Sequence, residues 1–213
     1  MRRSRVLIAA AVATGVLYLV GAVALDGAPD GSSSGAEIVA WFGDHRDAAR
    51  TYAFTAAFGT LAFAVLAALI RTLLPAPHRS VFMVGAAAFV VETAVQSWFW
   101  GGLALHPETL QPDTARAILD VGLLWGPVLT GATMAMIGPV MVLGLRAPRA
   151  IPGWLTALGA VAFAEQAIET ITTFGTHGFT VPGGDMNLLL GAGLVAVWLA
   201  GLVVWAVPRV NEA

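Results

Sequence analysis

The stretch AILDVGLLWGPVLTGATMAMIGPVMVLG, residues 117–144, contains one charged side chain, Asp120, close to its start. About 20 apolar residues in a helix are enough to cross the hydrocarbon core of a membrane. The apolar run is continuous, whereas barrel strands are shorter and alternate between apolar and polar residues. We therefore expect an all-α membrane protein.

Five further apolar runs have the same character, and each is bounded by charge, Pro or Gly. The six predicted transmembrane helices are 6–25, 52–70, 81–104, 117–144, 151–175 and 187–207. Of the 213 residues, 58% are hydrophobic and 11% are charged, compared with roughly 25% charged residues in soluble domains. The sequence predicts a single membrane domain over 1–213, a polytopic six-helix bundle in contact with the lipid bilayer.

The arginines predict how the chain is threaded, because cytoplasmic loops carry an excess of positive charge. Eight of the eleven basic residues fall at the ends of spans that share one side: Arg2, Arg3, Arg5, Arg71, Arg79, Arg146, Arg149 and Arg209. Three fall on the other side: Arg46, Arg50 and Arg116. Both termini are therefore predicted to be cytoplasmic, in a bacterial plasma membrane.

The N-terminal sequence MRRSR followed by an apolar run has two interpretations. It is either an uncleaved signal anchor or a secretory signal that is cleaved near residues 22–24. The run of about 20 residues is longer than the 7–15 of a typical signal core, which favours the anchor. The threading of the remaining spans is the same in both cases.

The predicted outer loop, residues 26–51, contains a short helix. Ser34 and Glu37 have the spacing of a capping box, in which each side chain bonds the backbone amide of the other residue. The apolar residues that follow are Ile38, Val39, Trp41 and Phe42. We interpret this segment as a helix lying in the membrane interface; the alternative is a lid over a pocket that opens outward.

Two segments of the chain resemble each other and suggest a repeat. Residues 88–97 read AFVVETAVQS and residues 161–170 read VAFAEQAIET, so that Glu92 matches Glu165 and Gln96 matches Glu169. The second and third spans would then correspond to the fourth and fifth. Two helices per unit preserve the orientation, so this repeat is parallel.

In a helical projection at about 100° per residue, the polar residues of spans 81–104 and 151–175 gather on one side of each helix. The predicted ligand-binding residues are Glu92, Gln96, Glu165, Gln166, Glu169 and Thr173. A charge near the middle of a span costs about 2.5–3.5 kcal/mol, so the glutamates must face inward, and at least some are expected to carry a proton. They either line a polar cavity for a proton, a cation or a small polar ligand, or they bond across helices as structural contacts.

The sequence shows no pattern typical of a catalytic, cofactor or nucleic-acid site. The chain has no cysteine, a net charge of -2 and no nucleotide or hydrolase motif, so we predict no catalytic residues, no cofactor and no nucleic-acid partner. His106 and His177 lie in predicted loops, which disfavours a haem or metal site. Gly126-Pro127 and Gly138-Pro139 predict kinks in the fourth span.

The segment SGAEIVAWFGDHRDAARTYAF, residues 34–54, together with the preceding span, resembles small uncharacterised multi-pass membrane proteins of actinobacterial type. That family implies a membrane fold but no activity. The Glu/Gln cluster within the spans instead favours a transport-type protein that binds a small polar ligand, proton or cation. The alternative is a structural or accessory subunit of an envelope complex, and an enzyme is not favoured.

Overall fold

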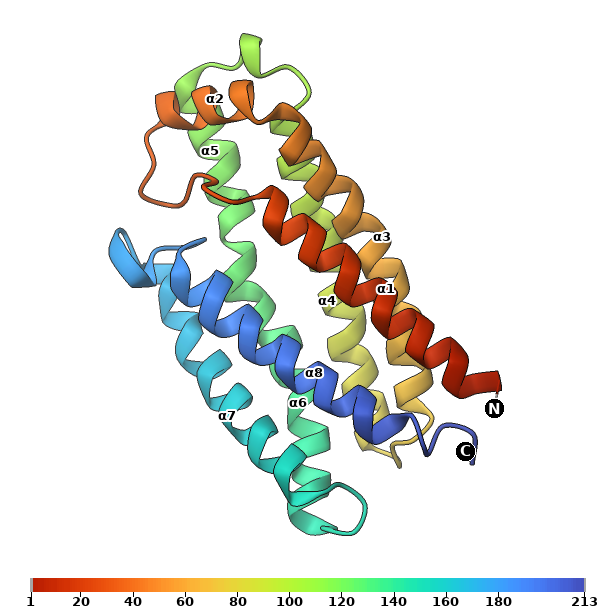
Figure 1. The fold of residues 1–213 in the computed structure, drawn as a ribbon. Helices are drawn as coiled ribbons and strands as arrows, with labels where there is room; N and C mark the ends of the chain where they lie inside the picture. Colours follow the sequence, from red (N-terminus) through yellow and green to blue (C-terminus); the bar gives the residue numbers. More distant parts are fainter. Residues whose placement is uncertain (1, 213) are drawn as a thin grey trace.

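The computed structural model describes residues 2–212, and over this range the regular elements are helices (Figure 1). Five of its helices are long and apolar enough to cross a membrane: Arg2–Ala24 (α1), Arg46–Arg71 (α3), His78–Leu103 (α4), Pro112–Arg146 (α5 with α6) and Met186–Ala206 (η4 with α8). The expected helical fold is thus confirmed over the described residues, and five helices have the length and apolar composition of membrane spans. The count of six spans and the internal repeat stay predictions.

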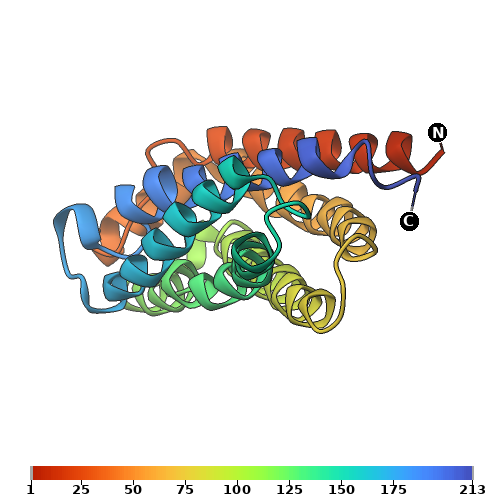
Figure 2. The same cartoon turned by 90° about the horizontal axis from the view of Figure 1, so that it is seen from below.

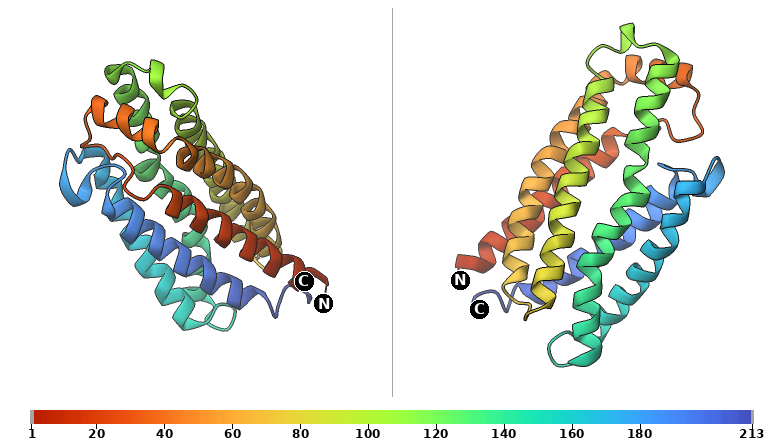
Figure 3. Two further views of the ribbon diagram at one scale, coloured as in Figure 1. Left: turned by 45° about the horizontal axis from the view of Figure 1, so that its top comes forward. Right: turned by 180° about the vertical axis from the view of Figure 1, so that it is seen from behind.

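The main helices of the described chain pack in a ring, in which each helix lies against the next one in chain order. Helix α1 packs on α3, α3 on α4, and α4 on α6 (Trp125–Arg146). Helix α6 in turn packs on α7 (Gly153–Glu169), and α7 on α8 (Ala192–Ala206). Contacts between α8 and α1 complete the ring, and the two helices run side by side in Figure 2. This order places α6 against both α4 and α7, the two helices that carry the predicted site residues (Figure 3).

The fourth predicted span is divided into α5 (Pro112–Leu123) and α6 (Trp125–Arg146), with a turn at Leu124. Pro127 has no amide hydrogen, so it cannot donate to the carbonyl of Leu123 four residues earlier. The interruption lies just before Gly126-Pro127, the first of the two predicted kinks. At the second Gly-Pro pair, by contrast, α6 continues through Pro139 without interruption.

The fifth predicted span is shorter than expected. Helix α7 (Gly153–Glu169) has 17 residues and is followed by a tighter 3-10 turn, η2 (Thr170–Phe174). A short 3-10 turn, η3 (Gly178–Thr180), lies in the loop beyond it. The sixth predicted span begins with a π-helix, η4 (Met186–Gly191), before the regular α8 (Ala192–Ala206).

Helix α2 (Gly35–Asp44) lies across one end of the bundle beside η1 (Pro107–Thr109) (Figure 1). The predicted capping box is confirmed, since the amide of Glu37 donates to the Ser34 hydroxyl at 3.3 Å and the amide of Ser34 donates to the Glu37 carboxylate at 2.6 Å. Ile38 and Phe42 are fully buried in a cluster with Trp100 of α4. The apolar side of α2 thus packs on the bundle, and its place in a membrane interface remains a prediction.

The opposite end gathers both termini with the α3–α4 and α6–α7 turns (Figure 3). The amide of Ser4 donates to Asn211 at 3.3 Å, which ties the start of the chain to its end. The core nearest this end is apolar and draws on α3, α4, α6 and α8; its large members include Phe63, Phe82, Met136, Ile137, Trp198 and Leu202. The outward side of α1 is also apolar, as expected of a surface in lipid: Val12, Val16, Leu19 and Val23.

Candidate functional site

The last turn of α7 carries three buried polar side chains. Glu165 is 8% exposed, Gln166 is 3% exposed and Glu169 is 4% exposed. Residues four apart lie on the same side of a helix, and Gln166 lies next to both glutamates. The structure therefore brings together the three residues of α7 that the sequence predicted as one group.

Gln166 links the two carboxyl groups to each other and to α6. Its side-chain amide nitrogen donates to Glu165 Oε2 at 2.9 Å and to Glu169 Oε2 at 2.5 Å. Its carbonyl oxygen accepts a hydrogen bond from the hydroxyl of Thr133 on α6. Both amide hydrogens and the carbonyl of this one side chain are therefore used.

Asn187, in the π-helix η4, completes the group from the other side. Its amide nitrogen donates to Glu169 Oε1 at 2.6 Å and to Thr172 Oγ1 at 3.2 Å. Its carbonyl oxygen accepts from the amide of Gly183 at 3.0 Å. Short π-helices are rare and occur often at functional sites; here the π-helix carries the second amide donor to Glu169.

Two glycines allow these elements to approach. A Cβ atom at Gly191 would lie 2.0 Å from Glu169 Oε2, and a Cβ at Gly126 would lie 3.1 Å from the Asn187 side chain. Any larger residue at 191 would therefore displace the carboxylate. The contact needs glycine at this point of η4.

The carboxyl oxygens of this network are unequally satisfied. Three of the four accept hydrogen bonds from amides, whereas Glu165 Oε1 is buried and has no hydrogen-bond partner. No ion pair among residues 2–212 involves Glu165 or Glu169. Two carboxyl groups thus lie together in an apolar bundle without a basic side chain to balance them.

The predicted residues of α4 form a separate group. Gln96 accepts a hydrogen bond from the Tyr52 hydroxyl of α3, and the adjacent Thr93 is buried. Glu92 is half-buried, and its Oε2 atom is buried without a hydrogen-bond partner. No hydrogen bond of the described residues joins this group to the α7 network, so five of the six predicted residues fall into two clusters.

Thr173 lies apart from both clusters. It is exposed on η2, whereas its neighbour Thr172 is fully buried and accepts from Asn187. Thr133, Thr172 and Asn187 are network members that the predicted set did not contain. The sequence could have identified Asn187, because it is a polar amide at the start of the otherwise apolar run 187–207.

The remaining polar candidates lie outside the bundle. His106 is 3.7 Å from Glu108 at the surface, and His177 contacts the adjacent Thr176. Within residues 2–212, no three His, Cys, Asp or Glu side chains are grouped as a metal site. Two surface hollows, of about 360 and 260 Å³, are lined by other residues than the predicted six.

Comparison with known proteins gives no match: no family model fits this chain, and no curated protein or solved structure is similar to it.

Proposed function

We propose that this protein is a small multi-pass membrane protein of transport type whose buried Glu165–Glu169 pair reversibly binds a proton. The observation that supports this most directly is Glu165 Oε1, a buried carboxyl oxygen with no hydrogen-bond donor. An isolated ionised carboxylate is very costly in an apolar interior, and a neutral acid costs far less. A proton on this oxygen removes one of two uncompensated charges.

The atoms around the pair favour a proton over a metal cation. Three of the four carboxyl oxygens face amide N–H groups of Gln166 and Asn187, whose positive ends repel cations. A metal ion needs several converging oxygens. A proton needs only one free oxygen, and Glu165 Oε1 supplies it.

The threading belongs to the same proposal. We infer six spans, counting α7 with η2, with both termini and most arginines in the cytoplasm and α2 outside, in a bacterial plasma membrane. Because the chain lacks cysteine, a single introduced cysteine can show on which side of the membrane its position lies. Ser32→Cys and Ser80→Cys are a matched pair at exposed positions on opposite ends of the bundle. A membrane-impermeant thiol reagent should label the first in intact cells and the second only after lysis; the reverse result would invert the threading.

The transport function is tested by proton movement across proteoliposomes. With an imposed pH gradient and potassium and valinomycin to balance charge, wild type should dissipate the gradient faster than protein-free vesicles. Glu165→Gln should abolish the difference, and Glu92→Gln, in the other cluster, should retain it. Wild-type vesicles that leak no faster than empty ones would contradict transport.

A structural or accessory subunit is the second candidate, and one observation favours it. The amide hydrogens of Gln166 and Asn187 all find acceptors, and the resulting network joins α6, α7, η2 and η4. Such interhelical bonds stabilise membrane bundles by about 1 kcal/mol each. This function predicts a protein partner that co-purifies with both wild type and Glu165→Gln, and no proton movement by either.

A further inference from the structure

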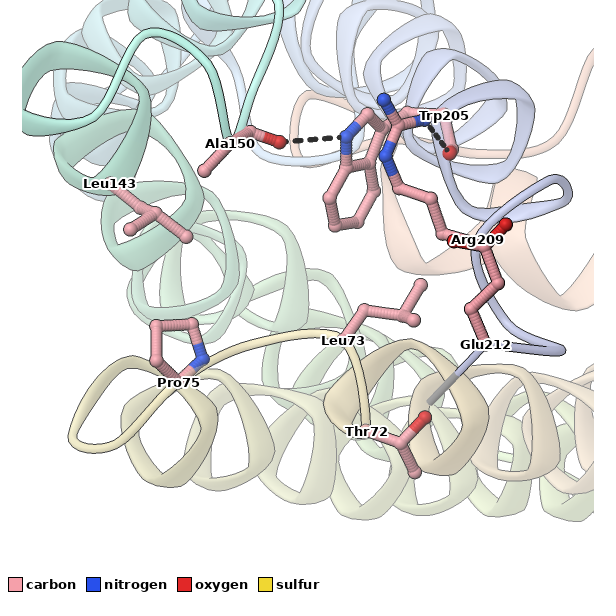
Figure 4. Close-up of a pocket in the computed structure, with 8 residues that line it drawn as sticks. All are labelled: Thr72, Leu73, Pro75, Leu143, Ala150, Trp205, Arg209 and Glu212. Carbon is pink, nitrogen blue, oxygen red and sulfur yellow. Dashed lines mark hydrogen bonds between the residues drawn. The ribbon is translucent and has the colours of Figure 1, made fainter.

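A hollow of about 360 Å³ lies at the end of the bundle that carries both termini (Figure 4). Three separate parts of the chain meet there: Thr72 and Pro75 of the α3–α4 turn, Ala150 of the α6–α7 turn, and the segment after α8. Its volume is within the range of about 300–1,000 Å³ that is usual for ligand sites. It is separate from the buried carboxyl network.

Arg209 is the cation of this hollow. Its guanidinium lies 5.3 Å from the ring centre of Trp205, and one nitrogen donates to the Trp205 carbonyl at 2.8 Å. The Trp205 ring is itself held by a hydrogen bond from Nε1 to the Ala150 carbonyl at 3.0 Å. A guanidinium has five N–H donors in a fixed fork. Only one of the Arg209 nitrogens donates to the Trp205 carbonyl. This bond holds the guanidinium in place and leaves its other N–H groups able to bind a ligand.

The opposite charge lines the same hollow. Glu212 and Thr72 both contribute to its wall, and Glu212 forms no ion pair with Arg209 among the described residues. Leu73 and Leu143 supply the apolar part. The hollow therefore presents a fixed guanidinium, a separate carboxylate and an apolar wall.

We propose that this hollow binds the phosphoethanolamine headgroup of a membrane lipid, with its phosphate on Arg209 and its ammonium on Glu212. A forked guanidinium suits phosphate oxygens. A carboxylate beside it disfavours a purely anionic headgroup and suits a primary ammonium, so the pair of charges matches a zwitterion. The hollow lies at the end of long apolar helices, where lipid headgroups meet a membrane protein.

The test is lipid retention measured by native mass spectrometry. The whole chain is reconstituted with equal amounts of phosphatidylethanolamine and phosphatidylglycerol of identical acyl chains, and adducts are counted after release. Wild type should retain the ethanolamine lipid preferentially. Arg209→Gln should weaken retention about tenfold, the effect of one charge-assisted phosphate contact.

Two further variants separate a headgroup site from general loss of charge. Arg149→Gln removes an exposed arginine that does not line the hollow, and it should retain lipid as wild type does. Glu212→Gln, beyond the last helix, should leave the phosphate contact but abolish the preference for ethanolamine over glycerol. Equal retention by Arg209→Gln and Arg149→Gln, or a wild type that retains phosphatidylglycerol equally well, would overturn the proposal.

Discussion

The two glutamate-bearing helices, α4 and α7, look alike in sequence and differ in structure. Glu92 and Gln96 match Glu165 and Glu169 in spacing, yet Gln96 has a single described hydrogen bond, to Tyr52. The α7 pair lies in a network of four elements, α6, α7, η2 and η4, with two amide donors to Glu169. The same spacing therefore produces an interhelical contact in one place and a buried acid pair in the other.

The difference comes from what surrounds each helix. Helix α7 carries a second amide, Gln166, directly after its first glutamate, and a π-helix brings Asn187 against the next one. The matching position after Glu92 is Thr93, which has no amide. Substitutions around each helix can therefore test whether the α7 network stabilises the fold more than the α4 group does.

The largest effect is expected from filling the space at Gly191. A methyl group there would lie 2.0 Å from Glu169 Oε2, so Gly191→Ala should destabilise the fold by about 1–3 kcal/mol, as overpacking does. Thermal denaturation in mild detergent measures the loss. Gly193→Ala is the control, since a Cβ at that position meets nothing within 4 Å. Equal stability of the two variants would contradict the close contact.

Removing one side-chain amide from each cluster compares how much the two clusters stabilise the fold. Asn187→Ala leaves Glu169 Oε1 and the Thr172 hydroxyl without their donor and should cost about 1–3 kcal/mol. Gln96→Ala removes only the described acceptor of Tyr52 and should cost about 1 kcal/mol. Unfolding in mixed micelles measures both. A larger loss for Gln96→Ala would show that α4, not α7, carries the stronger network.

Two adjacent threonines give a smaller effect with a built-in control. Thr172 is buried and accepts from Asn187, and Thr173 is exposed. Thr172→Val should cost about 1 kcal/mol and Thr173→Val less than about 0.5 kcal/mol in the same unfolding experiment. If Thr173→Val proved the more damaging, the placement of η2 would be wrong.

The smallest effect concerns an exposed carboxyl outside the bundle, in contrast to the buried pair. Hydrogen bonds from the Ser34 amide and hydroxyl lower the pKa of Glu37 below its ordinary value of 4.5. A lowered folded-state pKa means that this contribution to stability is present above pH 4.5 and is lost as the pH falls through the folded value. Melting temperatures across this acid range should fall less for Glu37→Gln than for wild type; identical slopes would contradict a stabilising capping box.

Much of the fold follows from local sequence signals. Long apolar runs specify helices, Ser34 and Glu37 specify the start of α2, and Pro127 divides the fourth span. These features depend on residues close together in the chain. Periodicity also groups Glu165, Gln166 and Glu169 correctly, because they lie within one regular helix.

The rest depends on departures from regular geometry and on the order of helices in space. A projection at 100° per residue places both Thr172 and Thr173 on the polar side of the helix. The chain instead forms the 3-10 turn η2, with 3.0 residues per turn, in which Thr172 is buried and Thr173 is exposed. The π-helix that orients Asn187 has no simple sequence signal. Nor does periodicity reveal that α6 packs against both α4 and α7, with separate polar clusters on these two helices.

Infrared difference spectroscopy of the reconstituted protein, on exchange into heavy water, tests most directly whether Glu165 carries a proton. A protonated carboxyl has a C=O stretching band that a carboxylate lacks. Glu165→Gln should remove a buried-acid band that Glu92→Gln retains, because Glu165 Oε1 is the one oxygen of the Glu165–Glu169 pair that accepts no hydrogen bond among the described residues. Persistence of the same band in Glu165→Gln would show that Glu165 does not hold the proton.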